Sequence, residues 1–312
     1  MHFDVVPAFF LLGVAATLVK TDLQFPRSLY QSLILFLLVA IGLKGGVALA
    51  EHGDAGVVKE AVAVVLLGVV LPLIAFPLLA VAGRLSRDDA ASIAAHYGSV
   101  SVATYAVAVA ILEGLAIAYE AYFPLFVVLL EMPAIVVGLA LARKQTGGFQ
   151  YRQVLHEIFC NQGLVLMTGG LLIGFWAGGA GVAPVMPFFG GLFHGVLALF
   201  LLQMGVVAAS RLADLRTTAP FLAAFGVLMP LIGATLGALL GLLMGFSNGG
   251  MILLAVLGGS ASYIAVPAVM QSALPEANHG LAIATSLGVT FPFNVLVGIP
   301  LYIALINQLF GS

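Results

Sequence analysis

Two Gly-Ser-x-Ser motifs set inside apolar segments hold the residues that are best suited to chemistry. GSVS occupies residues 98–101 and GSAS occupies residues 259–262. If each apolar helix unwinds at its glycine, Ser101 and Ser262 can cap the following half-helices, because a serine oxygen accepts from N–H groups that are otherwise unpaired. Two such N-termini can hold an anion without a basic side chain. The alternative interpretation is close packing of helices by small residues.

The predicted anion site combines both motifs with their neighbours. No Lys or Arg is expected at mid-depth in any apolar span, so a small monovalent anion is the substrate that these helix ends could neutralise. The aromatic residue that follows the second motif forms either a wall of the cavity or a hydrogen-bonding ligand. The predicted substrate-binding residues are Gly98, Ser99, Ser101, Thr104, Gly259, Ser260, Ser262 and Tyr263.

Glu131 is a second candidate, near the centre of an apolar span predicted at 120–142. An ionised carboxylate at that depth costs about 2.5 kcal/mol or more, so it needs a cation or a proton. The sequence repeats itself in its second half, and the part that matches Glu131 carries the neutral oxygens of Thr290 and Asn294 instead. Thr285 and Ser286 lie one turn or more before them. We therefore predict a Na+ site; the alternative is a protonated, hydrogen-bonded glutamic acid. The predicted Na+ ligands are Glu131, Ser286, Thr290 and Asn294.

The composition is that of an integral membrane protein. Of the 312 residues, 62% are hydrophobic and 8% are charged, and the mean hydropathy is +1.18. A helical span needs about 20 predominantly apolar residues, and ten runs of this kind are present. The predicted spans are 4–20, 28–49, 57–83, 90–111, 120–142, 161–179, 188–209, 219–246, 249–272 and 281–308.

The sequence repeats itself about 160 residues further on. GVVLPLIA at 68–75 matches GVLMPLIG at 226–233, and EMPAIVVG at 131–138 matches TFPFNVLVG at 290–298. Five spans per repeat is an odd number, so the second copy enters the membrane from the opposite face. We expect an all-α polytopic fold of ten transmembrane helices in a 5+5 inverted repeat, with helices 4 and 9 discontinuous. The expected divisions are residues 1–143, a cytoplasmic linker 144–160, and residues 161–312.

The distribution of basic residues predicts the orientation, because short loops that retain positive charge stay in the cytoplasm. With both termini extracytoplasmic, only Lys44 and Lys59 fall outside. The sequence therefore predicts a multi-pass protein of a bacterial inner membrane with no nucleic-acid partner. The basic residues on the cytoplasmic side would be Lys20, Arg27, Arg84, Arg87, Arg143, Lys144, Arg152, Arg211 and Arg216.

Serines at membrane depth also raise the possibility of an intramembrane hydrolase. Such an enzyme needs a His or Lys base next to its serine. His96 is the only base near a motif serine, and it has no evident orienting partner at mid-depth, so we expect no enzyme. His96 either lines the cavity or is a hydrogen-bonded core histidine. A passive anion channel would use the same helix ends and stays open as an alternative.

Several short patterns in order resemble the sodium-dependent bicarbonate transporter family, the SbtA-like permeases. They are GLKGGVALA at 42–50, the stretch 98–122, LLEMPAIVV at 129–137, MGVVAASRLADLR at 204–216, and the stretch 254–310. The resemblance implies Na+-coupled bicarbonate uptake by a homotrimer without a cofactor other than the coupling ion. It also implies a core domain of spans 3 to 5 and 8 to 10 that moves against a gate or scaffold of spans 1, 2, 6 and 7.

The chain departs from cyanobacterial members at two points. Tyr263 stands where they have an acidic residue, whereas Glu131 matches their intramembrane aspartate and keeps its charge. Their longer central cytoplasmic loop accompanies binding of a PII-like regulator, and the short linker here leaves that partner undecided. The expected function is Na+-coupled import of bicarbonate; the alternatives are a Na+-coupled symporter of another small monovalent organic anion and the passive channel.

Overall fold

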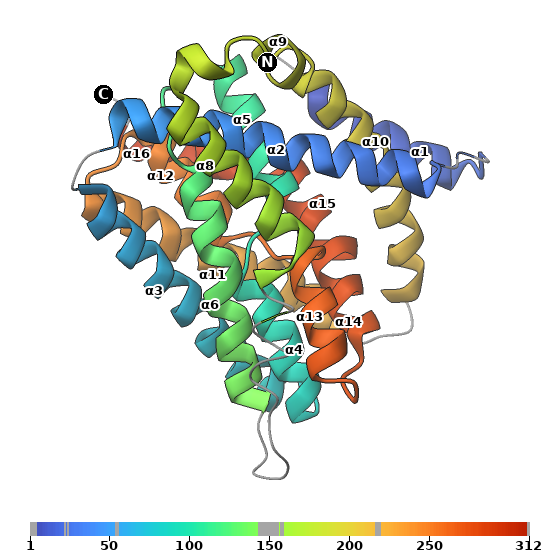
Figure 1. The fold of residues 1–312 in the computed structure, drawn as a ribbon. Helices are drawn as coiled ribbons and strands as arrows, with labels where there is room; N and C mark the ends of the chain where they lie inside the picture. The colour runs from blue at the N-terminus through green and yellow to red at the C-terminus, as the bar shows by residue number, and fades with distance from the viewer. Residues whose placement is uncertain are drawn as a thin grey trace.

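The computed structural model of the chain describes residues 5–21, 23, 25–53, 56–142, 156, 159–215 and 220–310. Within these residues the protein is helical, with no β-strand (Figure 1). Arg143, Lys144, Arg152 and Arg216, which enter the predicted orientation, lie outside the described residues, as does most of the predicted linker 144–160.

The helices follow the apolar runs of the sequence. Their bounds are α1 Val5–Leu18, α2 Arg27–His52, α3 Gly56–Pro77, η1 Leu78–Ala82, α4 Arg87–Gly98, α5 Val102–Gly114, α6 Pro124–Ala142, α8 Gln162–Val182, α9 Met186–Phe189, α10 Phe193–Leu215, α11 Pro220–Met244, α12 Asn248–Gly258, α13 Ala265–Ala273, α14 His279–Thr285, η2 Ser286–Thr290, α15 Phe291–Phe293, η3 Asn294–Gly298 and α16 Ile299–Phe310. The three η elements are short π-helical turns.

Eight helical segments of the described chain are long and apolar enough to cross a membrane. One of them, Arg87–Gly114, contains both α4 and α5, and another, His279–Phe310, runs from α14 to α16. The two other predicted spans, 4–20 and 249–272, overlap the shorter apolar helices Val5–Leu18 and Asn248–Gly258. The chain is therefore a multi-pass membrane protein by the length and composition of its helices.

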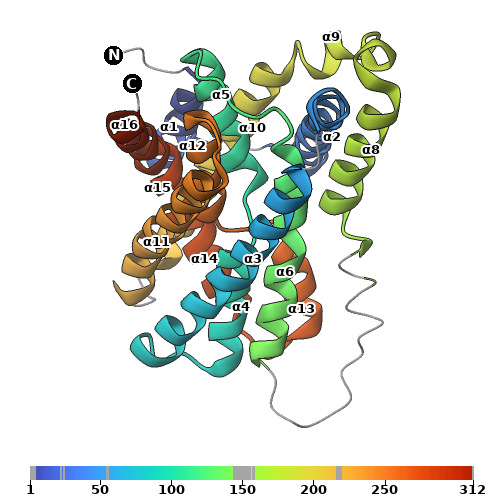
Figure 2. The ribbon, with the colours of Figure 1, turned by 90° about the vertical axis from the view of Figure 1, so that its left-hand side faces the viewer.

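Helices end at both Gly-Ser motifs. α4 ends at Gly98 and α5 begins at Val102, while α12 ends at Gly258 and α13 begins at Ala265. Between α4 and α5 the backbone is extended at Ser99, with ψ 178°, and at Ser101, with ψ 109°. In Figure 2, α5 lies above α4 and α12 lies above α13, so two interrupted segments pass through the middle of the molecule.

The most extensive helix contacts fall into two sets. α1 packs along α10 and α2 packs along α8, whereas α3, α4 and α6 pack on one another and α11 packs along α12. Glycines let α2 and α8 approach closely: a Cβ at Gly46 would meet the Leu171 carbonyl oxygen, and one at Gly174 would meet that of Leu43. α2 and α8 lie side by side in Figures 1 and 2.

Candidate functional site

The two Gly-Ser motifs are joined directly to each other. The Ser101 N–H donates to Ser260 Oγ (3.1 Å), and the Ser262 N–H donates to the His96 carbonyl oxygen (2.8 Å). His96 Nδ1–H donates in return to the Ser262 carbonyl oxygen (2.6 Å). All four residues are buried. These bonds satisfy backbone groups that leave the helical pattern, which apolar surroundings require.

Only the first motif serine caps a helix in the predicted way. Ser101 is the N-cap of α5, and its Oγ accepts from the Thr104 N–H at 3.1 Å. The expectation that Ser262 caps the second half-helix is wrong: the N-cap of α13 is Ile264, which makes no side-chain cap. Ser262 Oγ instead accepts a longer bond, 3.4 Å, from the Val266 N–H. The reason is that the interruption between α12 and α13 is longer than the one between α4 and α5.

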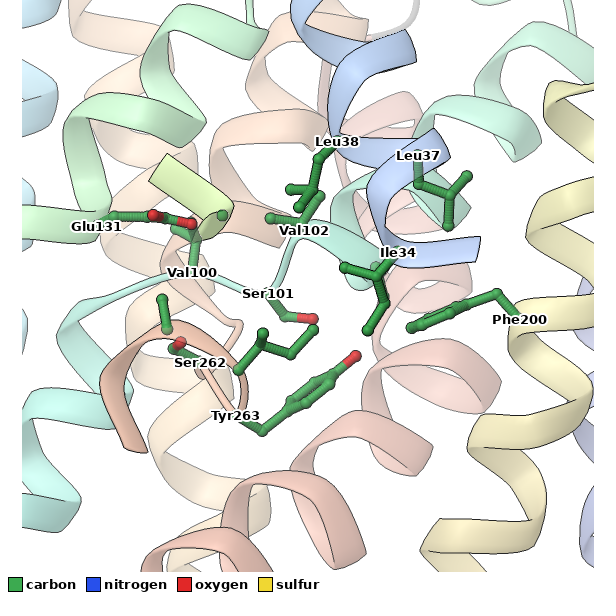
Figure 3. A pocket seen from close by; sticks show the side chains of 14 residues that line it. Ile34, Leu37, Leu38, Val100, Ser101, Val102, Glu131, Phe200, Ser262 and Tyr263 are labelled. Carbon is green, nitrogen blue, oxygen red and sulfur yellow. The ribbon is translucent and has the colours of Figure 1, made fainter. Parts of the chain in front are cut away.

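A small cavity lies beside the joined motifs, with a water-accessible volume of about 30 Å³. Because a single water needs about 10 to 15 Å³ on this measure, the space corresponds to about two water-sized groups. Helices α2 and α10 close it on the side away from the motifs (Figure 3). Its lining is Ile34, Leu37, Leu38, Val100, Ser101, Val102, Ala103, Glu131, Gly163, Phe200, Ser262, Tyr263, Ile264 and Ala265.

Three of the eight predicted substrate-binding residues line this cavity: Ser101, Ser262 and Tyr263. The Tyr263 hydroxyl points into the space between Ser101 and Phe200 (Figure 3). Ser101 Oγ accepts from a backbone N–H and keeps its own proton, so it can still donate to a bound anion. The cavity therefore offers hydroxyl donors within walls that are otherwise mostly apolar.

The other five predicted residues are buried and do not line the cavity. Ser260 Oγ donates to the Leu257 carbonyl oxygen at 3.0 Å while it accepts from Ser101. A Cβ at Gly98 would crowd the side chains of Pro72 and Ala134, so only glycine fits where α4 ends. None of the five is part of the cavity lining; they are Gly98, Ser99, Thr104, Gly259 and Ser260.

Glu131 lies in the same cavity as the motif serines. Its side chain comes from α6, is 4% exposed, and makes no hydrogen bond or ion pair with another described residue. Within that part of the chain no group of three or more His, Cys, Asp or Glu side chains is arranged to hold a metal ion. A cation at Glu131 would therefore rely on one carboxylate and on neutral oxygens, which suits Na+ better than a transition metal.

The other three predicted Na+ ligands do not line the Glu131 cavity, and their oxygens are bonded elsewhere. Thr290 Oγ1 donates to the Gly226 carbonyl oxygen (2.7 Å) and accepts from the Tyr97 hydroxyl (2.6 Å). Ser286 Oγ donates to the Ala282 carbonyl oxygen at 2.7 Å, within its own helical turn. Residues at matching positions of two sequence repeats need not line the same space, and of the predicted set of four only Glu131 lines this cavity.

Asn294 braces the second interruption. Its Nδ2 donates to the Gly259 carbonyl oxygen at 2.7 Å, and its Oδ1 accepts from the Tyr302 hydroxyl at 3.2 Å. Both ends of the amide are used, so it fixes the end of α12 against the π-helical turn that begins at Asn294. Thr285, one residue before the preceding π-helical turn, donates to the Leu281 carbonyl oxygen at 2.7 Å.

Sequence reasoning did not find the residues that close the cavity from α2 and α10. Ile34, Leu37 and Phe200 are ordinary members of apolar spans, and nothing in their spacing distinguishes them from lipid-facing residues. His96 is the hydrogen-bonded core histidine of the two interpretations, since its Nδ1 is paired and it does not line the cavity.

His96 should therefore stabilise the joined motifs rather than bind substrate. We expect His96→Leu to cost about 1 to 3 kcal/mol of stability, because it leaves the buried Ser262 carbonyl without its partner. His96→Asn should cost clearly less, since its amide N–H can replace Nδ1–H. Thermal unfolding of the purified protein in detergent measures both. A Leu variant as stable as the wild type would contradict this role.

Comparison with known families identifies the chain. The family model of the Na+-dependent bicarbonate transporter superfamily matches residues 6–307, nearly the whole sequence. No curated protein matched the chain. The chain belongs to the Na+-dependent bicarbonate transporter superfamily.

Proposed function

We propose that this member of the Na+-dependent bicarbonate transporter superfamily is a secondary active transporter that imports bicarbonate together with Na+. The observation that carries the proposal is the placement of Glu131, Ser101 and Ser262 in one cavity of about 30 Å³. An anion held by the serines would lie close to the Glu131 carboxylate. Two like charges about 4 Å apart repel by about 4 kcal/mol at an effective dielectric constant of 20.

A cation bound at Glu131 removes that repulsion, so binding of Na+ and binding of the anion favour each other. Coupling between two ligands through a shared site is reciprocal: each raises the affinity for the other by the same factor. The energetics of transport agree with this arrangement. Import of one negative charge against an inside-negative potential costs about 2.3 kcal/mol per 100 mV, and a co-transported Na+ cancels that cost.

Alternating access would move the two sets of packed helices against each other. The core would comprise α3 to α6 and α11 to α16, with the joined motifs, and the gate or scaffold would comprise α1, α2, α8 and α10. The cavity lies where α2 and α10 meet the motifs, so a shift between the sets would open it. The proposal includes a ten-span 5+5 inverted repeat, a homotrimer in a bacterial inner membrane, and both termini on the extracytoplasmic side.

The test is uptake of labelled bicarbonate into proteoliposomes with and without an inward Na+ gradient. We expect accumulation above equilibrium that requires the gradient. Accumulation of formate or acetate in place of bicarbonate would favour a symporter of small organic anions, with the same site and a different cargo. Equilibration without accumulation would indicate a passive channel and would overturn coupled transport.

A further inference from the structure

The small cavity lined by Ser101, Glu131 and Ser262 is called the substrate cavity below. A second, larger cavity adjoins it, with a water-accessible volume of about 740 Å³. It lies between the start of α2, the start of α8 and α13. We call it the Arg27 vestibule, after the charged residue in its lining; its other polar lining residues include Gln31, Cys160, Asn161 and Gln162. Its size and the polar groups in its lining make it a space for water rather than a packing defect.

The two cavities share part of their walls. Ile34, Leu38, Gly163 and Ile264 line both of them. Because Gly163 has no side chain, little but aliphatic side chains separates the substrate cavity from the vestibule at this point. A short movement of α2 or of the segment after the second motif would join the two spaces. The cavity of about 600 Å³ lined by α2, α3, α6 and α8 shares no lining residue with the substrate cavity.

The charge of the vestibule favours anions. Arg27 contributes a permanent positive charge, and no Asp or Glu is among the described lining residues. The start of the 21-residue helix α8 adds the positive end of its dipole, although the Asn161 side chain already accepts from the Gly163 N–H at 2.9 Å. A cleft lined by one sign of charge raises the local concentration of the opposite ion.

We propose that the Arg27 vestibule is the cytoplasmic mouth of the substrate path, and that Arg27 concentrates the transported anion there. This inference rests on the proposed function for the identity of the anion, and on the predicted orientation for the side of the membrane. Arg27 lines the vestibule and not the substrate cavity, so it would act on the ion in transit and not on the ion at the motifs.

The chain carries its own probe of the vestibule. Cys160 is its only cysteine, is exposed and lies in the vestibule lining, with its Sγ 3.4 Å from His156 Nδ1. Two methanethiosulfonate reagents of similar size serve as probes, the anionic sulfonatoethyl and the cationic trimethylammonioethyl compound. In each case the thiolate attacks the reagent sulfur, forms a mixed disulfide and releases methanesulfinate. Cys160→Ser controls for labelling elsewhere.

We expect labelling of Cys160 in inverted membrane vesicles, which expose the cytoplasmic face, and not in right-side-out vesicles. Relative to a free thiol, the anionic reagent should react faster than the cationic one by about threefold or more, and high salt should reduce the difference. Arg27→Gln should abolish the preference and Arg27→Lys should keep it. His156→Gln shows how much of the preference comes from the histidine and how much from Arg27; the preference should persist in this variant. Labelling only from the outside, or a preference unchanged in Arg27→Gln, would overturn the proposal.

Gly163 supplies a second measurement that tests the path itself. A Cβ at Gly163 would lie 3.2 Å from Asn161 Oδ1. Gly163→Val therefore adds bulk to the wall between the two cavities and obstructs passage from one to the other. We expect uptake to fall at least about tenfold while Cys160 still reacts from the cytoplasmic side. Normal uptake by this variant would show that the path runs elsewhere. Labelling of Cys160 does not require transport. If the expected labelling is seen and bicarbonate uptake is absent, the proposed substrate is wrong, but the vestibule remains an anion path.

Discussion

The double variant Ser101→Ala, Ser262→Ala is expected to lose nearly all bicarbonate uptake, with the apparent dissociation constant for bicarbonate raised by about a hundredfold or more. Both hydroxyls line the cavity and can donate to an anion held there. Loss of one hydrogen bond to a charged group costs about 1.5 to 3 kcal/mol, which is roughly tenfold or more in affinity. Each single variant should therefore lose about tenfold, and the double variant about the product.

The folded protein should survive these substitutions. Ser101 also caps α5 through the Thr104 N–H, and loss of a cap costs about 1 kcal/mol, so the loss in substrate binding is the larger effect. Ser210→Ala is a matched control, because Ser210 is exposed and bonds only the Val206 carbonyl of its own helix. Uptake and thermal stability of the four variants give the comparison. Ordinary uptake by the double variant would show that the serines only pack helices and that the anion site lies elsewhere.

The helices could be predicted from the sequence because lipid imposes a simple rule on it. The predicted span 57–83 corresponds to α3 with its π-helical turn, Gly56–Ala82, and the span 120–142 contains α6, Pro124–Ala142. A long apolar run in lipid forms a helix because the helix satisfies every backbone N–H and C=O group within the segment. The helix ends at Gly98 and Gly258 also fall at the motifs, since glycine and serine favour the end of a helix over its continuation.

The site could be predicted only in part, because it depends on contacts between distant segments. The Gly-Ser spacing pointed to Ser101 and Ser262, and the buried charge pointed to Glu131, but no sequence pattern shows that these three share a cavity. The lining residues of α2 and α10 are aliphatic or aromatic, as lipid-facing residues also are. Such assignments need the positions of the helices, which composition and spacing do not supply.

The predicted Na+ ligands show a different limit. Thr290 and Asn294 have oxygens suited to Na+, and sequence alone cannot tell a free oxygen from one already in use. In the structure Thr290 is bonded to Tyr97 and to the Gly226 carbonyl, and Asn294 to the Gly259 carbonyl and to Tyr302. Their oxygens hold helix segments together, which leaves Glu131 as the predicted Na+ ligand that lines a cavity with Ser101 and Ser262.

Replacement of Glu131 by Gln is expected to remove the Na+ dependence of uptake. The amide keeps the shape and the hydrogen-bonding capacity of the side chain. It deletes the charge of the carboxylate in the cavity that Glu131 shares with Ser101 and Ser262. In the proposed coupling Na+ relieves the repulsion between that charge and the anion, and the Gln variant has no such repulsion. Bicarbonate should then bind without Na+ at least about tenfold more tightly than it binds the Na+-free wild type, while accumulation driven by a Na+ gradient is lost.

Glu131→Asp is the matched control, because it keeps the charge and shortens the side chain; it should retain Na+ dependence with weaker affinity for Na+. Glu131→Ala is less informative, since it removes shape and charge together. Bicarbonate binding measured at zero and saturating Na+, with uptake in proteoliposomes, separates coupling from folding, because a misfolded variant would bind under neither condition. If Glu131→Gln transports with the wild-type Na+ requirement, Glu131 is a structural residue, and the link between cation and anion must be made by groups outside this cavity.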